Sequence, residues 1–383
     1  MSPMTPSQAE EFMLRSASLL ETETVTLRDS LGRILREALV ADRPFPPFDR
    51  VTMDGIACKF DGRQEYVLHG LHAAGSPLPE ALPEGSCWQI MTGAALPPDC
   101  DTVVPYEEAE INDTQARLTS DAKPGIFIHR KGSDAQPGDV LVESGTRIRP
   151  AHLGLAASIG AVAMAVARQP RITILTTGDE LVLPEDQPQA HQLRQSNGLT
   201  LKAAIHEWGP AKISLLHLAD DLEATTTGLQ RAMESSDLVI VSGGISKGRK
   251  DFVLPAMQSL VGDPLFHGVL QRPGKPLAFW PGVAALPGNP NSTLTTFHRY
   301  LVPLLNTMSG TPQKHTAMLP FETEITRHPR LTVFIPCVIS REGKLRSLIP
   351  QNSGDFVTPL PATGFAEVPP GTNLASEGRY RAY

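Results

Sequence analysis

The chain of 383 residues lacks the features that mark several classes of protein. It has four cysteines, none of them in a C-x-x-C pair, so it offers no structural zinc motif. Lys and Arg number 34 against 41 Asp and Glu, and no segment is strongly basic, which argues against a nucleic-acid partner. The polar N-terminus has no apolar signal core, so we expect a cytoplasmic protein.

The sequence also lacks a long hydrophobic run. The longest apolar stretch, around residues 153–167, is rich in alanine and is interrupted by Gly154, Ser158 and Gly160. A membrane span requires about 20 consecutive apolar residues, so we expect no membrane partner. Hydrophobic residues still make up 41% of the chain, enough for sizeable cores, and the length predicts two to four domains.

The pattern of residues changes along the chain. Ser7 and Glu10 match a capping box and predict an opening helix. Short β-rich runs between residues 51 and 149 predict an all-β module. From residue 171, strands alternate with helices, among them a helix at 196–208 that Gly209 ends, which predicts a doubly wound parallel sheet with helices on both faces. After about residue 311, β character returns and predicts a small barrel or sandwich.

The segment DLVIVSGGISKGRKD carries the strongest local pattern. Gly243, Gly244 and Gly248 permit tight turns in which backbone N–H groups approach an anion. The helix that follows would add its positive N-terminal end. Taken alone, the segment fits a phosphate-binding loop and an ordinary glycine-rich connection equally well.

Two further loops have related chemistry. In LPGNPNSTLTTF, Gly288 and Asn289 lie in a turn with free N–H groups, and Ser292 or Thr293 is expected to cap the next helix. In RPGKPLAFW, Lys275 follows a Pro-Gly turn from which its ammonium group can reach a phosphate. This segment is not a Walker A loop, because Pro276 stands where Ser or Thr must hold magnesium.

Carboxylates recur beside turns and suggest a cation site. They are Asp54, Asp134, Asp179, Glu180, Asp220 and Asp251. Carboxylate oxygens suit a hard cation such as Mg²⁺, provided that the fold brings several together. A solvated or capping role explains each of them separately.

One alternative of a different class arises from the same glycine-rich segment. Residues 244–248 match the G-x-S-x-G nucleophile elbow of serine hydrolases, with Ser246 as the nucleophile. Asp263 and His267 follow in the order of that family. The elbow, however, requires a helix directly after the serine, whereas Gly243 and Gly244 favour a wide anion-binding loop.

Taken together, nine ordered motifs resemble the molybdopterin molybdenumtransferase family. They are PPFDRVTMDGIA, QIMTGAALPPDCDTVVPYEE, KGSDAQPGDVLVESGTRI, GLAASIGAVAMAV, PRITILTTGDELV, SNGLTL, SGGISKGRKDF, RPGKPLAF and LPGNPNSTLTTF. They span most of residues 1–310. The C-terminal β segment is a weaker match.

The resemblance implies an α/β multidomain fold with four domains. It implies a discontinuous helical dimerisation domain (1–48 and 143–168), an inserted β-rich domain (49–142), an α/β domain that binds the molybdopterin nucleotide (169–311) and a C-terminal β-barrel (312–383). It also implies a homodimer with its active site between subunits.

The implied reaction places molybdate into adenylylated molybdopterin, uses Mg²⁺ and releases AMP. Carried over by motif, the catalytic residues are Asp54, Asp134, Glu180, Asp220, Asp251 and Lys275. The substrate-binding residues are Thr92, Gly243, Gly244, Ser246, Arg272, Gly288, Asn289 and Ser292. The implied Mg²⁺ ligands are Asp54, Glu180, Asp220 and Asp251. Asp54 and Thr92 are expected to face the α/β domain of the partner subunit, and Arg272 stands where the family usually has a second lysine.

Two related readings share these motifs. A molybdopterin adenylyltransferase, which acts one step earlier, has the same α/β domain, but its loop usually reads Gly-Gly-Thr-Gly. A transient contact with that enzyme is expected. A non-enzymatic scaffold is the third class, and the retained carboxylates argue against it.

Overall fold

The structure is a computed structural model that describes residues 3–245, 251–313, 316–352 and 354–383. The chain divides into two compact units. The core unit comprises Met1–Arg36, Gly145–Arg149 and Ala163–Tyr383, and the inserted unit comprises Glu37–Ser144 and Pro150–Val162. None of the described helices is both long enough and apolar enough to cross a membrane.

The centre of the core unit is a six-stranded sheet in the order β16-β13-β17-β21-β20-β18. The strands are β13 (Arg171–Thr177), β16 (Lys212–Leu218), β17 (Leu238–Ser242), β18 (Phe266–His267), β20 (Ala278–Trp280) and β21 (Val283–Leu286). The first four strands in that order are parallel, as the sequence predicts. The hairpin strand β20 pairs antiparallel with β21 and with the edge strand β18, so only β20 runs against the other strands, an arrangement that the strand–helix pattern did not predict.

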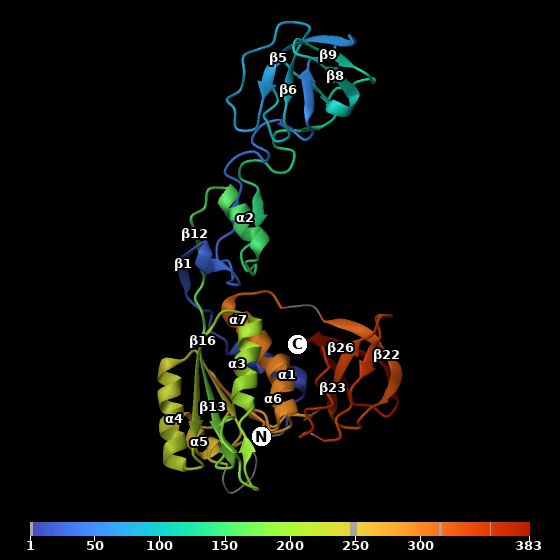
Figure 1. Cartoon of the computed structure of the whole chain (residues 1–383). Helices are drawn as coiled ribbons and strands as arrows, with labels where there is room; N and C mark the ends of the chain where they lie inside the picture. Colours follow the sequence, from blue (N-terminus) through green and yellow to red (C-terminus); the bar gives the residue numbers. More distant parts are fainter. Residues whose placement is uncertain (1–2, 246–250, 314–315, 353) are drawn as a thin grey trace. The chain divides into compact units, whose positions relative to one another are not determined.

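Helices cover both faces of this sheet, which confirms the predicted layers (Figure 1). They are α1 (Pro6–Arg15), α3 (Asn197–Trp208), α4 (Leu222–Ser235), α5 (Val253–Val261), α6 (Pro290–Thr296), the π-helical turn η3 (Phe297–Leu301) and α7 (Val302–Ser309). One buried cluster packs α1, α3 and α7 against Ile172 and Ile240. The other packs α4 and α5 against Leu175 and Val241. Neighbours along one strand therefore face opposite cores.

The N-cap of α1 lies two residues before the predicted one. Thr5 is the N-cap, and its side chain and that of Gln8 form the capping box. Ser7 lies inside the helix, so the prediction of a box at Ser7 and Glu10 is wrong. Both pairs satisfy the sequence rule, but Pro6 suits the first helical position because its missing N–H needs no partner there.

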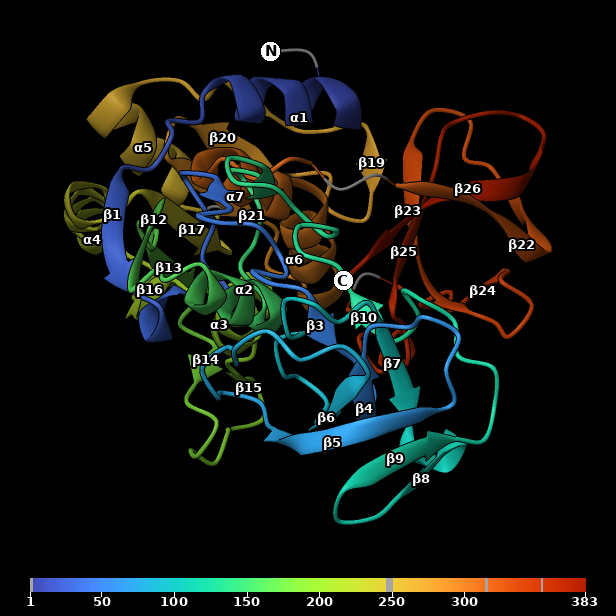
Figure 2. The same ribbon diagram turned by 90° about the horizontal axis from the view of Figure 1, so that it is seen from above.

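The C-terminal part of the core unit is a closed β-barrel (Figure 2). Its strands are β22 (Ala317–Thr326), β23 (Thr332–Ile339), β24 (Leu345–Ser347), β25 (Gly364–Val368) and β26 (Leu374–Ala382). The pairings β23–β24, β24–β22, β22–β26, β26–β25 and β25–β23 close the ring. The short strand β19 (Gln271–Arg272) joins the barrel at β23. This settles the sequence-based choice in favour of a barrel.

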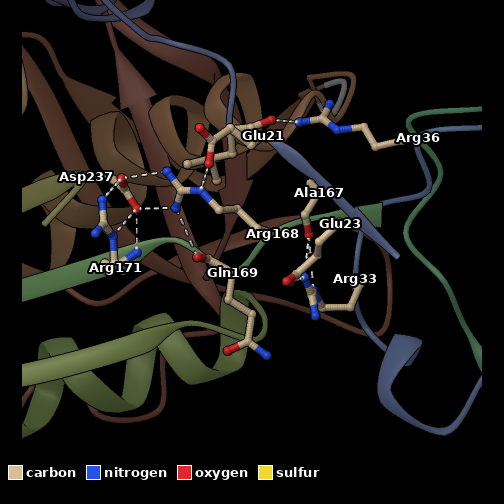
Figure 3. Close-up of polar contacts among 10 residues, drawn as sticks. Glu21, Glu23, Arg33, Arg36, Ala167, Arg168, Gln169, Arg171 and Asp237 are labelled. Carbon is tan, nitrogen blue, oxygen red and sulfur yellow. Dashed lines mark hydrogen bonds and ion pairs between the residues drawn. The ribbon is translucent and has the colours of Figure 1, made fainter. Parts of the chain in front are cut away.

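Smaller elements complete the core unit. They are β1 (Thr22–Thr26) paired with β12 (Ala163–Ala167), β14 (Leu181–Val182) paired with β15 (Leu193–Arg194), and the 3-10 turn η1 (Arg28–Ser30). Ion pairs tie the start of β1 and the end of β12 to the sheet (Figure 3). Arg168 contacts Asp237 at 2.6 Å and Glu21 at 3.1 Å, and Arg171 contacts Asp237 at 3.1 Å.

The inserted unit is mostly β-structure, as predicted. Its sheet has the order β7-β4-β6-β5-β9-β8. The strands are β4 (Gly55–Cys58), β5 (Glu65–His72), β6 (Ser86–Ile90), β7 (Thr102–Pro105), β8 (Ala109–Ile111) and β9 (Gln115–Leu118). It also holds β2 (Leu39–Val40) paired with β11 (Val140–Val142), β3 (Arg50–Val51) paired with β10 (Ile128–His129), the 3-10 turn η2 (Tyr106–Glu108) and helix α2 (Pro150–Ser158).

Candidate active site

A large cavity of about 1340 Å³ lies in the core unit where the parallel strands end. Open α/β sheets bind ligands outside the carboxyl ends of their strands, so this is the expected place for a site. The predicted site residues that line it are Glu180, Asp220, Gly243, Gly244, Asp251, Arg272, Lys275, Gly288, Asn289 and Ser292. The barrel contributes Leu331, Asn352, Gly354 and Phe356. Residues far apart in the sequence therefore border one space.

Carboxylates occupy the end of the cavity near β16 and β13. The backbone N–H of Asp179 donates to the carboxylate of Asp220 at 3.3 Å, and the N–H of Asp220 donates back to Asp179 at 3.1 Å. This reciprocal pair locks the two loops together. Gly178 has φ +134°, and a Cβ there would lie 2.8 Å from the Glu180 carboxylate oxygens. The positive φ favours glycine at this turn, over which the Glu180 carboxylate lies.

The glycine bend follows β17 in the middle of the row of strand ends. Gly243 and Gly244 have φ values of +101° and +68°, which strongly favour glycine. A Cβ on either would lie 3.0 Å from the hydroxyl of Thr177, so the bend packs closely on the end of β13. Ser246 falls outside the described residues, as do Lys247 to Lys250, and its predicted role in holding phosphate stays a prediction.

Two cationic side chains border the cavity on the side of the barrel. Arg272 ends β19 and pairs in register with Val333 of the barrel, and Lys275 follows the turn at Gly274. A Cβ on Gly274 would lie 3.8 Å from Pro287, so this turn is adjacent to the loop after β21. The cavity therefore runs from carboxylates, past glycine bends, to cations.

The loop after β21 differs from the prediction in how its helix begins. Asn289 is the N-cap of α6, and Pro290 occupies the first turn. Ser292 lines the cavity but lies inside the helix, so its predicted capping role is wrong. The Thr293 hydroxyl donates to the Pro287 carbonyl at 2.6 Å and so joins the first turn of α6 to the loop before it.

The sequence reasoning missed Asn197, which joins two of these loops. Its side-chain amide donates to the Ser242 hydroxyl at 2.9 Å and to the Gly288 carbonyl oxygen at 2.6 Å. It lies in the motif SNGLTL, where the pattern indicated only the start of a helix. Gln195 and His217 were also missed. Both contact the Thr176 hydroxyl, which borders the cavity.

The remaining predicted residues belong to the inserted unit. The carboxylate of Asp54 accepts a hydrogen bond from the Thr92 N–H at 2.6 Å. Hydrogen bonds from the Thr92 side chain and backbone hold the pKa of Asp54 below its usual value, so the group stays ionised. Asp134 contacts His129 at 2.7 Å, and this hydrogen bond lowers the pKa of Asp134. Both carboxylates are thus kept as anions by near neighbours.

A metal site made by the protein alone is not present in the described part of the chain. No group of three or more His, Cys, Asp or Glu side chains converges there closely enough to hold an ion. Glu180, Asp220 and Asp251 share the cavity wall, but a cation at that end would need further oxygen ligands. Mg²⁺ is commonly held by one or two carboxylates together with substrate phosphates, and these residues fit that arrangement.

The hydrolase alternative is not supported by the described residues. His267 faces the carbonyl oxygen of Ile245 at 3.3 Å, while Asp263 accepts a hydrogen bond from Gln258. No bond between Asp263 and His267 occurs in the described contacts, although a triad needs the carboxylate to orient the imidazole.

Comparisons with known proteins identify the family of the chain. Residues 4–160 match the MoeA N-terminal region (domain I and II), and residues 173–307 match a probable molybdopterin binding domain. A molybdopterin molybdenumtransferase of Synechocystis sp. is 37% identical over 90% of both chains. One of Haemophilus influenzae is 33% identical over 81% of this chain and 79% of its own.

Solved structures show the same fold. The molybdopterin biosynthesis MoeA protein of Pyrococcus horikoshii OT3 covers 100% of both chains with a TM-score of 0.85 at 22% identity. Together with the sequence relatives, this establishes that the chain belongs to the molybdopterin molybdenumtransferase family.

Proposed function

We propose that this protein inserts molybdate into adenylylated molybdopterin and releases AMP, the last step of molybdenum cofactor assembly. The observation that supports it best is the order of groups along one cavity. Asp220 and Glu180 follow β16 and β13, Gly243 and Gly244 follow β17, and Gly288 follows β21, with Arg272 and Lys275 beyond. An anhydride joining a pterin to a nucleotide requires both anion-binding and acid–base groups within one such space.

The cationic end would act on the leaving nucleotide. As the phosphoanhydride breaks, negative charge would grow on the AMP oxygens. Lys275 and Arg272 line the cavity, and their cationic groups would stabilise that charge. Donors fixed before the reaction stabilise such charge without reorganisation. The backbone N–H groups at Gly244 and Gly288 would bind the phosphates, and Ser292 and Asn289 would extend that surface. The N–H of Gly243 donates to the Leu286 carbonyl at 3.3 Å, so Gly243 would contribute by shaping the bend.

The carboxylate end would handle water and a divalent cation. Glu180, Asp220 and Asp251 would hold Mg²⁺ jointly with the substrate phosphates. When bound, Mg²⁺ would polarise the phosphoryl group and offset the repulsion between carboxylates and substrate. These carboxylates would also orient the water or oxyanion that attacks the substrate.

We also propose a homodimer in which Asp54, Thr92 and Asp134 of one subunit complete the site of the other. The Asp54 carboxylate is exposed, and Thr92 keeps it ionised. Both properties suit a residue that contacts a ligand bound to the other subunit. The helical segments within 1–48 and 143–168 would form the dimer contact. A transient contact with molybdopterin adenylyltransferase would deliver the substrate directly.

The decisive experiment measures AMP release from adenylylated molybdopterin with and without molybdate and Mg²⁺. We expect release that depends on both additions. Consumption of ATP with molybdopterin as acceptor would instead identify an adenylyltransferase. A protein that binds adenylylated molybdopterin but never releases AMP under any of these conditions would be a scaffold, which contradicts the proposal.

A further inference from the structure

A buried hydrogen-bond chain leads from η3 to the turn that carries Lys275. The Tyr300 hydroxyl donates to the side-chain oxygen of Gln271, and the Gln271 amide donates to the carbonyl oxygen of Gly274 at 3.0 Å. We propose that Tyr300 and Gln271 are positioning residues that set the anion affinity of the cationic end of the cavity. This inference rests on the function proposed above, since it assumes that Lys275 binds substrate phosphate.

Burial fixes the direction of this chain of hydrogen bonds. Tyr300 is 0% exposed and Gln271 is 1% exposed, so neither can exchange its partner for bulk water. The Gly274 carbonyl can only accept, which places the Gln271 amide nitrogen toward it and the amide oxygen toward Tyr300. Burial also raises the pKa of Tyr300, so its hydroxyl remains a donor across the working pH range.

The turn at Gly274 and Lys275 is tightly packed on its neighbours. Gly274 has φ +83°, and a Cβ there would lie 2.5 Å from Thr296 and 2.9 Å from the Gln271 amide nitrogen. The Val269 N–H donates to the Lys275 carbonyl at 2.9 Å, which closes the other side of the turn. The Gln271 amide is therefore the side-chain contact that sets how far the turn, and the Lys275 ammonium with it, stands from the phosphate position.

Tyr300 is itself held by a charged cluster on the same π-helical turn. The neighbouring Arg299 is fully buried and forms ion pairs with Glu10 of α1 at 2.9 Å and Glu367 of β25 at 3.0 Å. Its guanidinium also lies 5.0 Å from the ring centroid of Tyr300. Single π turns inside helices occur frequently at functional sites. Here the π turn directs Arg299 toward the barrel and α1, and it directs Tyr300 toward Gln271 and the turn that carries Lys275.

The test compares two tyrosines that each lose one hydrogen-bonded hydroxyl. Tyr300→Phe removes the donor to Gln271, whereas Tyr380→Phe removes a hydroxyl that bonds Thr363 at 2.9 Å within the barrel. Titration calorimetry of the full chain with pyrophosphate measures anion affinity without any need for turnover. We expect about tenfold weaker binding for Tyr300→Phe, because misplacing one charge-assisted contact is worth roughly one power of ten, and a change of less than about twofold for Tyr380→Phe.

A double-mutant cycle with Lys275→Ala separates positioning from a general loss of stability. In the Lys275→Ala background, Tyr300→Phe should weaken pyrophosphate binding no further, because its effect acts through that lysine. Equal binding by Tyr300→Phe and wild type, or an equal further loss in the Lys275→Ala background, would overturn the inference. A wild-type protein whose pyrophosphate binding does not depend on Lys275 would contradict the proposed anion site as well.

Discussion

The side-chain amide of Asn197 donates to the carbonyl oxygen of Gly288 across 2.6 Å and so joins the start of α3 to the loop after β21. The same nitrogen lies 2.9 Å from the Ser242 hydroxyl at the end of β17. One side chain thus fixes the spacing of two loops that are proposed to bind phosphate. Both loops line the cavity, so a change in their spacing would alter the contacts of an anion bound between them.

Asn197→Asp tests this link with almost no change in shape. A carboxylate cannot donate to the Gly288 carbonyl, and its charge would repel both that oxygen and a bound phosphate. We expect the kcat/KM for AMP release to fall about 100-fold, as a misplaced set of donors commonly produces. Asn373→Asp, at an exposed barrel position, makes the same change of charge and should leave the rate intact. Equal rates for the two variants would remove Asn197 from the site.

How much of the fold and of the site could be predicted depends on how far apart in the sequence the interacting residues lie. The end of α3 followed from Gly209, because a stop residue acts on its own helix. The contact between Tyr300 and Gln271 joins residues 29 apart, and the link between Asn197 and Gly288 joins residues 91 apart. No local pattern specifies such pairs. The edge strand β18 escaped prediction because a two-residue strand carries too little periodicity, whereas the sequence predicts short strands at 277–280 and 283–286 that match β20 and β21.

Lys275→Met should affect chemistry more than folding. The change keeps the length of the apolar stem and removes the charge that is proposed to neutralise the leaving AMP. We expect kcat for AMP release to fall on the order of 100-fold, which is the usual effect of losing one donor to developing charge. Lys212→Met, at an exposed position of β16, serves as the control in the same rate assay. A wild-type kcat with only a raised KM would show that Lys275 binds substrate without acting on the transition state.

His298 should make the core unit sensitive to acid. Burial lowers its pKa to about 4, and its ring packs against Phe297 at 5.2 Å and Tyr383 at 4.9 Å between centroids. The unfolded chain binds this proton near pH 6.5. The contribution of neutral His298 to the free energy of unfolding is therefore complete above that pH and is lost as the pH falls toward 4. Its full size is on the order of 3 kcal/mol.

Urea unfolding between pH 4 and pH 7 measures this contribution. His298→Gln should flatten the fall in the free energy of unfolding within that window, because the variant has no group to protonate there. His206→Gln, an exposed position of α3, should keep the wild-type slope. An identical slope in the wild type and His298→Gln would mean that another group causes the acid sensitivity.

Mixing two inactive variants tests whether the site is shared between subunits. Asp54→Ala alters the inserted unit, and Lys275→Met alters the core unit. If Asp54 of one subunit serves the cavity of the other, a mixed dimer holds one site with both changes and one intact site. Random exchange makes half of the dimers mixed, so AMP release should recover to about a quarter of the wild-type rate.

A matched pair shows whether such recovery has the proposed cause. Glu180→Gln and Lys275→Met both lie in the core unit and line the same cavity. Mixing these two variants leaves one change in every site, so the rate should stay at the level of the single variants. Recovery in both mixtures would mean that residues of the core unit, as well as those of the inserted unit, are shared between subunits. No recovery with Asp54→Ala, once mass spectrometry has confirmed mixed dimers, would place Asp54 at the cavity of its own subunit or outside the site altogether.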